Sequence, residues 1–167
     1  ELGITTLKWS PLKDEAIPKD SCGIIIPGGF PENHAEELSS CRKSITSIQK
    51  LYGKKPIYAE CGGMIFLGET LTDKNNKIHN MAGLLPLSTR KGNLKIGYRK
   101  MRGKGNNLII KEGDSFMGHE FHRWEVFESM KLSCNKNLIT LENKLNYLNH
   151  PWTITGWKVR ERDEGWS

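Results

Sequence analysis

The chain has 167 residues, of which 37% are hydrophobic, and this length suffices for one sizeable core but is short for two. No apolar run reaches the length of a membrane span and nothing at the start resembles a signal peptide, so we expect a cytoplasmic protein without membrane contacts. The cysteines are far apart, with no C-x-x-C pair and no metal-ligand spacing, which predicts reduced thiols and no metal site. They are Cys22, Cys41, Cys61 and Cys134.

The net charge is +6, and seven basic residues fall in one short segment, which raises the question of nucleic-acid binding. These residues are Arg90, Lys91, Lys95, Arg99, Lys100, Arg102 and Lys104. No zinc-finger pattern or aromatic RNA-binding signature accompanies them, so we expect no nucleic acid as partner. Lysine-rich strand edges also discourage unwanted strand pairing, and a solvated edge is the simpler interpretation.

Strands and helices alternate in the N-terminal half of the sequence. Short apolar runs predict strands at Thr5–Ser10, Cys22–Ile26 and Pro56–Glu60. Helical spacing of apolar residues predicts a helix from Pro31 to Leu51, and a short helix begins at Gly63. This order implies a parallel sheet with crossover helices.

Cys61 ends the strand Pro56–Glu60 and directly precedes two glycines. Small residues stand two positions before and after it, at Ala59 and Gly63, as a sharp strand-to-helix turn requires. We therefore predict that Cys61 lies at the end of a central parallel strand, in an unusual backbone conformation, where the helix N-terminus favours the thiolate. The alternative is a small buried residue at a tight turn.

The sequence becomes β-rich after Met81. Candidate strands are Leu94–Met101, Asn107–Ile110, His119–Phe127 and Trp152–Val159. Polar turns are predicted at Asp73–Asn76, Gly103–Asn107 and Asn135–Asn137.

Four motifs carry a resemblance to a known family, and they follow one another along the chain in the order found in that family. They are Pro27–Glu32 (PGGFPE), Tyr58–Gly63 (YAECGG), Met81–Pro86 (MAGLLP) and Gly118–His122 (GHEFH). From about Trp9 to Trp166 the chain resembles the class I glutamine amidotransferase domain found at the C-terminus of the cobyrinic acid a,c-diamide synthases. The resemblance implies an α/β, flavodoxin-like sandwich with a parallel sheet in its N-terminal half.

The resemblance also implies roles for particular residues. Cys61 is the expected nucleophile toward the side-chain amide of glutamine, and Gly62 with Gly28 or Gly29 would supply backbone N–H donors to the oxyanion. The synthetase domain of such proteins uses ATP and magnesium. No phosphate-binding Gly-rich loop with a lysine occurs in these 167 residues, so we expect no cofactor here.

A cysteine nucleophile needs an imidazole to move protons, and the five histidines differ in their suitability. His119 and His122 are three residues apart on a predicted strand, so at most one can face Cys61. Either could be the base or have a structural role, as could Glu60 beside the nucleophile. His79 and His150 stand in polar contexts and are predicted to be solvated.

His34 falls in the first turn of the helix from Pro31, where the helix dipole disfavours a cation. In the relatives, the catalytic histidine lies in a C-terminal segment that has no counterpart after Trp166. The expected base is therefore missing from this sequence.

The resulting hypothesis is one amidotransferase domain, residues 1–167, truncated at both ends, without its synthetase domain and inactive by itself. In the intact enzyme it would supply ammonia for amidation of the a and c carboxylates of cobyrinic acid. The basic segment would then attract this polycarboxylate. Open alternatives are another acceptor (hydrogenobyrinic acid, cobyric acid or a nickel tetrapyrrole) and a non-catalytic binding module.

Overall fold

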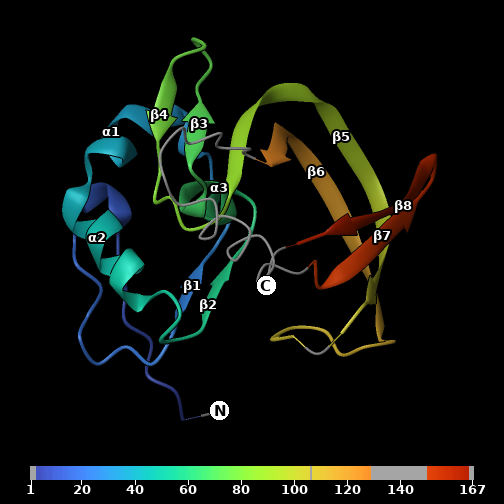
Figure 1. The fold of residues 1–167 in the computed structure, drawn as a ribbon, viewed down its shortest axis with the longest axis horizontal. Coiled ribbons are helices and arrows are strands. Elements are labelled where there is room, and N and C mark those ends of the chain that lie inside the picture. The colour runs from blue at the N-terminus through green and yellow to red at the C-terminus, as the bar shows by residue number, and fades with distance from the viewer. Residues whose placement is uncertain (1–2, 106, 129–149, 166–167) are drawn as a thin grey trace, which may run out of the picture. The chain divides into compact units, whose positions relative to one another are not determined.

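The computed structural model describes residues 3–105, 107–128 and 150–165. They form two compact units (Figure 1). The first unit contains the described residues 3–91 and 125–128, and the second contains 92–105, 107–124 and 150–165. The fold is α/β, as the sequence predicts, and its strands pair both in parallel and antiparallel.

The first unit begins with a strand–helix–strand arrangement. Strands β1 (Ile24–Ile26) and β2 (Ile57–Ala59) are parallel, with Ile24 opposite Ile57. Among the described residues β2 pairs only with β1, so its predicted central position is wrong. The helical elements of this unit are η1 (Pro11–Lys13), η2 (Pro31–Asn33), α1 (Ala35–Ser40), α2 (Arg42–Leu51) and α3 (Gly62–Leu67).

The predicted strand Thr5–Ser10 is not formed. The Trp9 indole Nε1 donates to the Glu15 carbonyl (2.7 Å), and the backbone N–H of Ser10 donates to Glu15 Oε2 (3.0 Å). These local hydrogen bonds engage the end of the segment, which is an irregular loop leading into η1.

The predicted helix from Pro31 to Leu51 is broken into three pieces, with the main break at Cys41 (φ −75°, ψ 72°). The hydroxyls of Ser39 and Ser40 donate back to helix carbonyls and so compete with the continuing helical bonds. Asp14 Oδ1 then accepts from the N–H groups of Lys43 and Ser44 (2.7 and 3.1 Å) and caps α2 from another part of the chain. The predicted apolar stripe is nevertheless buried, and it comprises Leu38, Cys41, Ile45 and Ile48.

A short antiparallel hairpin of β3 (Thr70–Thr72) and β4 (Ile78–Asn80) completes the first unit. It turns at the predicted Asp73–Asn76 segment, where Asp73 Oδ1 accepts from the N–H groups of Asn75 and Lys77. Strand β3 also pairs in parallel with the beginning of β5 (Leu87–Gly103). The core of the unit centres on Ile48, Leu71 and Leu87, which are fully buried.

The second unit is built from strands. It contains the later part of β5, most of β6 (Ser115–Glu128), β7 (Trp152–Gly156) and β8 (Val159–Glu164). Strand β5 pairs with β6 and, antiparallel, with β7 (Arg99 opposite Gly156). The predicted strands Leu94–Met101 and His119–Phe127 lie within β5 and β6 and are confirmed.

Two strand predictions in this unit are wrong. Trp152–Val159 is a hairpin, because the chain turns at Trp157 and Lys158, the latter with φ 55°. Asn107–Ile110 is irregular, since Asn107 Oδ1 accepts from the N–H groups of Ile109 and Ile110 and holds a turn. The predicted turn Asn135–Asn137 and the fourth cysteine, Cys134, lie outside the described residues.

Candidate active site

Cys61 stands at the predicted strand-to-helix turn. It follows β2 after one residue and is the N-cap of α3, with φ 48° and ψ −116°. A non-glycine residue in such a conformation costs roughly 1–3 kcal/mol and persists only where the surroundings enforce it. The thiol is exposed, so the predicted elbow geometry is confirmed and the alternative of a buried small residue is wrong.

Two glycines after the cysteine allow this turn to pack. A Cβ at Gly63 would lie 2.3 Å from the Ile26 carbonyl oxygen at the end of β1. A Cβ at Gly62 would lie 2.5 Å from the Gly29 carbonyl oxygen. The N-terminus of α3 therefore rests directly on the backbone of β1 and of the turn that follows it.

The Pro27–Gly29 turn lies beside the thiol. The backbone N–H of Glu60 donates to the Ile26 carbonyl (3.2 Å), which places the ends of β1 and β2 side by side. A Cβ at Gly28 would lie 3.4 Å from Cys61 Cβ and 3.9 Å from its Sγ. Within the described residues, the backbone N–H groups of Gly28, Gly29 and Gly62 donate to no other group of the chain. Three unused donors thus belong to the two segments next to the exposed thiol.

Glu60 has a partner of its own. Its Oε2 accepts a hydrogen bond from the Tyr58 hydroxyl at 2.9 Å. This bond, followed by burial, raises the pKa of Tyr58. The Glu60 carboxylate is therefore hydrogen-bonded to the side chain of Tyr58, two residues earlier in the chain.

Two histidines share the first unit with Cys61, and both are bound to carboxylates. His34 Nδ1 lies 3.0 Å from Glu37 Oε2 on α1. His79 is buried, with Nε2 2.9 Å from Asp73 Oδ2. The prediction that His79 is solvated is wrong, because the hairpin folds it back onto the carboxylate of its own turn. Neither histidine is hydrogen-bonded to the thiol.

The hydrogen bond from His79 is the main reason that the pKa of Asp73 lies below its ordinary value. Burial opposes this shift, and the N–H groups of Lys77 and Asn75 add to it. The carboxylate thus stays ionised into the acid range.

His119 and His122 lie on β6 in the second unit and have separate surroundings, as their predicted opposite faces require. The His119 ring meets Tyr98 edge-on (5.3 Å between centroids) and stacks near Phe121. His122 places Nδ1 2.7 Å from the Trp124 carbonyl and Nε2 2.8 Å from Glu120 Oε1.

Glu120 is the centre of a charged cluster. Its carboxylate also accepts from Arg99 Nε (2.6 Å) and Arg162 Nη2 (3.2 Å). Burial raises the pKa of Glu120, but the hydrogen bonds from His122 and Arg99 outweigh burial, and the net pKa is lowered. His122 is therefore held in a structural cluster with Glu120.

His150 belongs to the second unit as well. It is half-buried, with Nδ1 2.7 Å from the Gly165 carbonyl, so the prediction of a solvated side chain is wrong. The segment carrying Gly165 folds back over it.

Across the described part of the chain, no group of three or more His, Cys, Asp or Glu side chains is arranged to hold a metal ion. In the same part, no helix is long and apolar enough to cross a membrane.

An α/β unit with an exposed, strained cysteine between a strand and a helix, beside a glycine turn, is the arrangement expected of a class I glutamine amidotransferase domain. Residues 2–150 match the family described as "CobB/CobQ-like glutamine amidotransferase domain". The chain belongs to this family.

Similar proteins carry two related names. A "Hydrogenobyrinate a,c-diamide synthase" of Mesorhizobium japonicum is 39% identical over 123 residues, 72% of this chain and 28% of that protein. "Cobyrinate a,c-diamide synthase" of Saccharolobus solfataricus is 37% identical over 68% of this chain and 26% of its own length. The same name belongs to a Synechocystis protein, 35% identical over 94% of this chain and 32% of its length. The chain thus spans about a quarter to a third of these relatives.

Proposed function

We propose that the chain is the glutamine-hydrolysing part of an a,c-diamide synthase and that Cys61 is its nucleophile. The thiolate attacks the side-chain amide carbon of glutamine, and the resulting oxyanion accepts hydrogen bonds from Gly62 and from Gly28 or Gly29. Collapse of this intermediate breaks the C–N bond, and the nitrogen leaves as ammonia after taking up a proton. Water then hydrolyses the thioester to glutamate and restores the thiol.

The observation that carries this proposal is the Cys61 backbone. A positive φ at a non-glycine residue lowers the stability of the fold, and a cysteine with a purely structural role would not require it. It keeps the thiol exposed next to Gly28, whose unused N–H belongs to the turn touching Cys61. Members of this family are glutamine amidotransferase domains, which fits a nucleophile that acts on an amide.

The destination of the ammonia is proposed from the relatives. Their names describe the conversion of two carboxylates, a and c, into amides. We infer that ATP and magnesium activate those carboxylates in a synthetase domain of the longer protein, and that this chain binds neither. Both cobyrinate and hydrogenobyrinate occur in the names, so either corrinoid is a suitable acceptor, with cobyric acid and a nickel tetrapyrrole as alternatives.

The test uses the full-length protein with ATP, magnesium and cobyrinic acid. We expect Cys61→Ser to abolish amidation with glutamine while amidation with ammonium chloride continues. Cys22→Ser changes the other exposed cysteine of the first unit and should leave both activities intact. Glutamine use that survives in Cys61→Ser would favour the non-catalytic binding module instead.

A further inference from the structure

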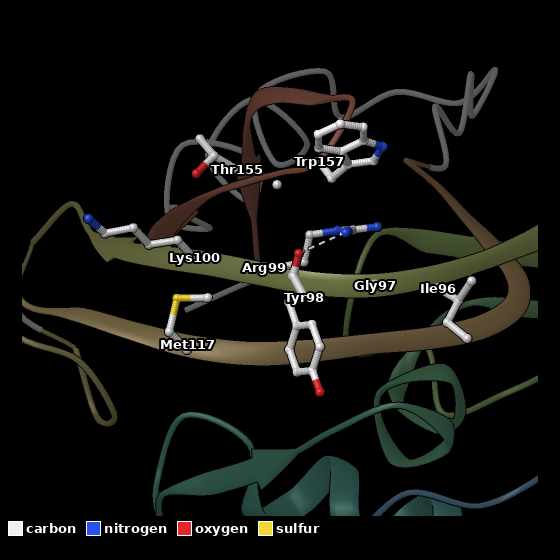
Figure 2. Close-up of a pocket in the computed structure, with 9 residues that line it drawn as sticks. Ile96, Gly97, Tyr98, Arg99, Lys100, Met117, Thr155 and Trp157 are labelled. Atoms are coloured by element: carbon white, nitrogen blue, oxygen red, sulfur yellow. Dashed lines mark hydrogen bonds between the residues drawn. The ribbon is translucent and has the colours of Figure 1, made fainter.

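The second unit contains an open cavity that the glutaminase chemistry does not use. It has a volume of about 450 Å³ and lies between β5 and the β7–β8 hairpin (Figure 2). This volume falls in the range of small-molecule sites, roughly 300–1,000 Å³. Arg99, Lys100, Thr155 and Trp157 are among its lining residues.

Arg99 is a buried cation at this cavity. Its side chain is 9% exposed, and Figure 2 shows it on the same side of β5 as Thr155 and Trp157. Nε donates to Glu120 and Nη1 to the Tyr98 carbonyl (2.9 Å). Among the described residues, Nη2 has no hydrogen-bond partner. Nη2 of this fixed guanidinium is therefore available to an anion. The planar guanidinium group is well suited to bind a carboxylate.

Two glycines make room for this guanidinium. A Cβ at Gly97 would lie 2.7 Å from Arg99 Nη1, and a Cβ at Gly156 would lie 3.0 Å from the same atom. Any larger residue at either position would displace the arginine. Strands β5 and β7 thus each have a glycine where the Arg99 guanidinium lies.

The cavity carries further positive charge. Lys100 lines it and forms no ion pair with any described residue. Lys158 Nζ lies 6.0 Å from the centroid of the Trp157 ring. The charges of Arg99 and Arg162 are balanced by Glu120 and Glu164, so the two lysines give the site an excess of positive charge.

Trp157 adds a flat apolar surface. It occupies the turn between β7 and β8 and is 85% exposed, the largest exposed fraction among the exposed hydrophobic residues of the described chain. An exposed indole gives a planar ligand a face to pack against, and the neighbouring lysines favour a ligand with negative charge.

We propose that this cavity binds the acceptor substrate, a flat macrocycle bearing several carboxylates, through one of its carboxylate edges. Arg99 Nη2 receives one carboxylate, Lys100, whose side chain extends the other way in Figure 2, receives another, and Trp157 packs against the ring. This inference rests on the proposed function, which supplies the acceptor class through the relatives' names.

The experiment is a calorimetric titration of the full-length protein with cobyrinic acid, without ATP or glutamine. We expect Trp157→Ala to weaken binding about tenfold and Lys100→Gln about threefold or more. Two matched controls change exposed residues of the same unit outside the cavity, Phe116→Ala and Lys111→Gln, and should bind like the parent protein. Both cavity variants change exposed side chains, so a folding defect is not expected, and circular dichroism checks this.

Two further ligands test the chemistry of recognition. A corrinoid whose carboxylates are all amidated should bind at least about tenfold more weakly than cobyrinic acid. A single-stranded 20-nucleotide DNA should not compete for the site. Equal binding of the amidated corrinoid, competition by DNA, or unchanged affinity in Trp157→Ala would overturn the proposal.

The two proposals can fail separately. Ammonia release from glutamine by the parent protein and by Cys61→Ser decides the glutaminase proposal and does not depend on the cavity. No detectable binding of cobyrinic acid by a protein that hydrolyses glutamine would reject the cavity as acceptor site and leave the glutaminase intact.

Discussion

Cys61 depends on the glycines around it more than on any side chain. Gly63 touches the Ile26 carbonyl at the end of β1, and Gly28 touches the cysteine itself. The contact of Gly63 is with backbone atoms, which cannot move aside as a flexible side chain can. The residue types at positions 62 and 63 are therefore set by close packing of two strand ends against a helix start.

We expect Gly63→Ala to destabilise the protein by about 1–3 kcal/mol, because its methyl group would overlap the Ile26 carbonyl oxygen. Gly29→Ala is the matched control, since nothing lies within 4 Å of a Cβ at that position. Its effect should stay within about 0.5 kcal/mol. Urea unfolding curves of both variants make the comparison. Equal stabilities would show that α3 does not rest on β1 as described.

The exposed thiols should differ in reactivity. Cys61 is exposed in a strained turn at the start of α3, so we expect it to react first with iodoacetamide. Cys41 should react slowly, because burial, followed by the nearby Asp14 carboxylate, raises its pKa. Cys22 is exposed without a helix terminus behind it and should be intermediate. Peptide mapping after brief treatment gives the order, and preferential labelling of Cys22 would contradict activation of Cys61.

At the scale of elements, the β3–β4 hairpin is held by its own turn. Asp73 accepts from two N–H groups of the turn and from buried His79, and Lys77 forms an ion pair with Glu36 on α1 (2.5 Å). A six-residue pair of strands gains little from its ladder, so these polar contacts stabilise it. They also link the hairpin to the helical part of the first unit.

The pH dependence of stability should reflect Asp73. Its pKa is lowered in the folded state, so its contribution is present above the unfolded pKa, about 3.9, and is lost as the pH falls through the folded value. We expect Asp73→Asn to lower the melting temperature at pH 6 and to flatten its decline between pH 5 and 2.5. Thermal melts across this range provide the measurement. The control is Asp20→Asn, at an exposed position, whose profile should match that of the parent.

On the scale of the whole molecule, the strained cysteine belongs to the first unit, and the second unit is built from strands and contains a charged cluster. The histidines of the first unit are both committed to carboxylates. His122 in the second unit is committed to Glu120 and Trp124. Within the described first unit, the proposed nucleophile Cys61 is therefore hydrogen-bonded to neither histidine.

We therefore expect the 167-residue chain alone to release ammonia from glutamine at least about 10²-fold more slowly than the full-length protein, since general acid–base catalysis contributes 10²–10⁴-fold. A coupled glutamate dehydrogenase assay measures this directly. Fast release by the chain alone would contradict the prediction. It would point to His119 or His122 as the base, which His119→Gln and His122→Gln would then distinguish.

The sequence by itself determined the features that depend on neighbouring residues. The elbow at Cys61, the glycine turn before it and the buried stripe from Leu38 to Ile48 all follow from local sterics and helical periodicity. The Asp73–Asn76 turn is likewise a matter of adjacent polar side chains.

Tertiary structure alone decided the features whose partners are distant or whose strands are short. Asp14 caps α2 at Lys43 and Ser44, and this distant contact supports the helix break at Cys41. Arg99 meets Glu120 only because β5 and β6 pair. Hydrogen bonds between residues 20 to 30 positions apart leave no periodic trace in a sequence, because each position records only its own chemistry and not the partner that folding brings to it.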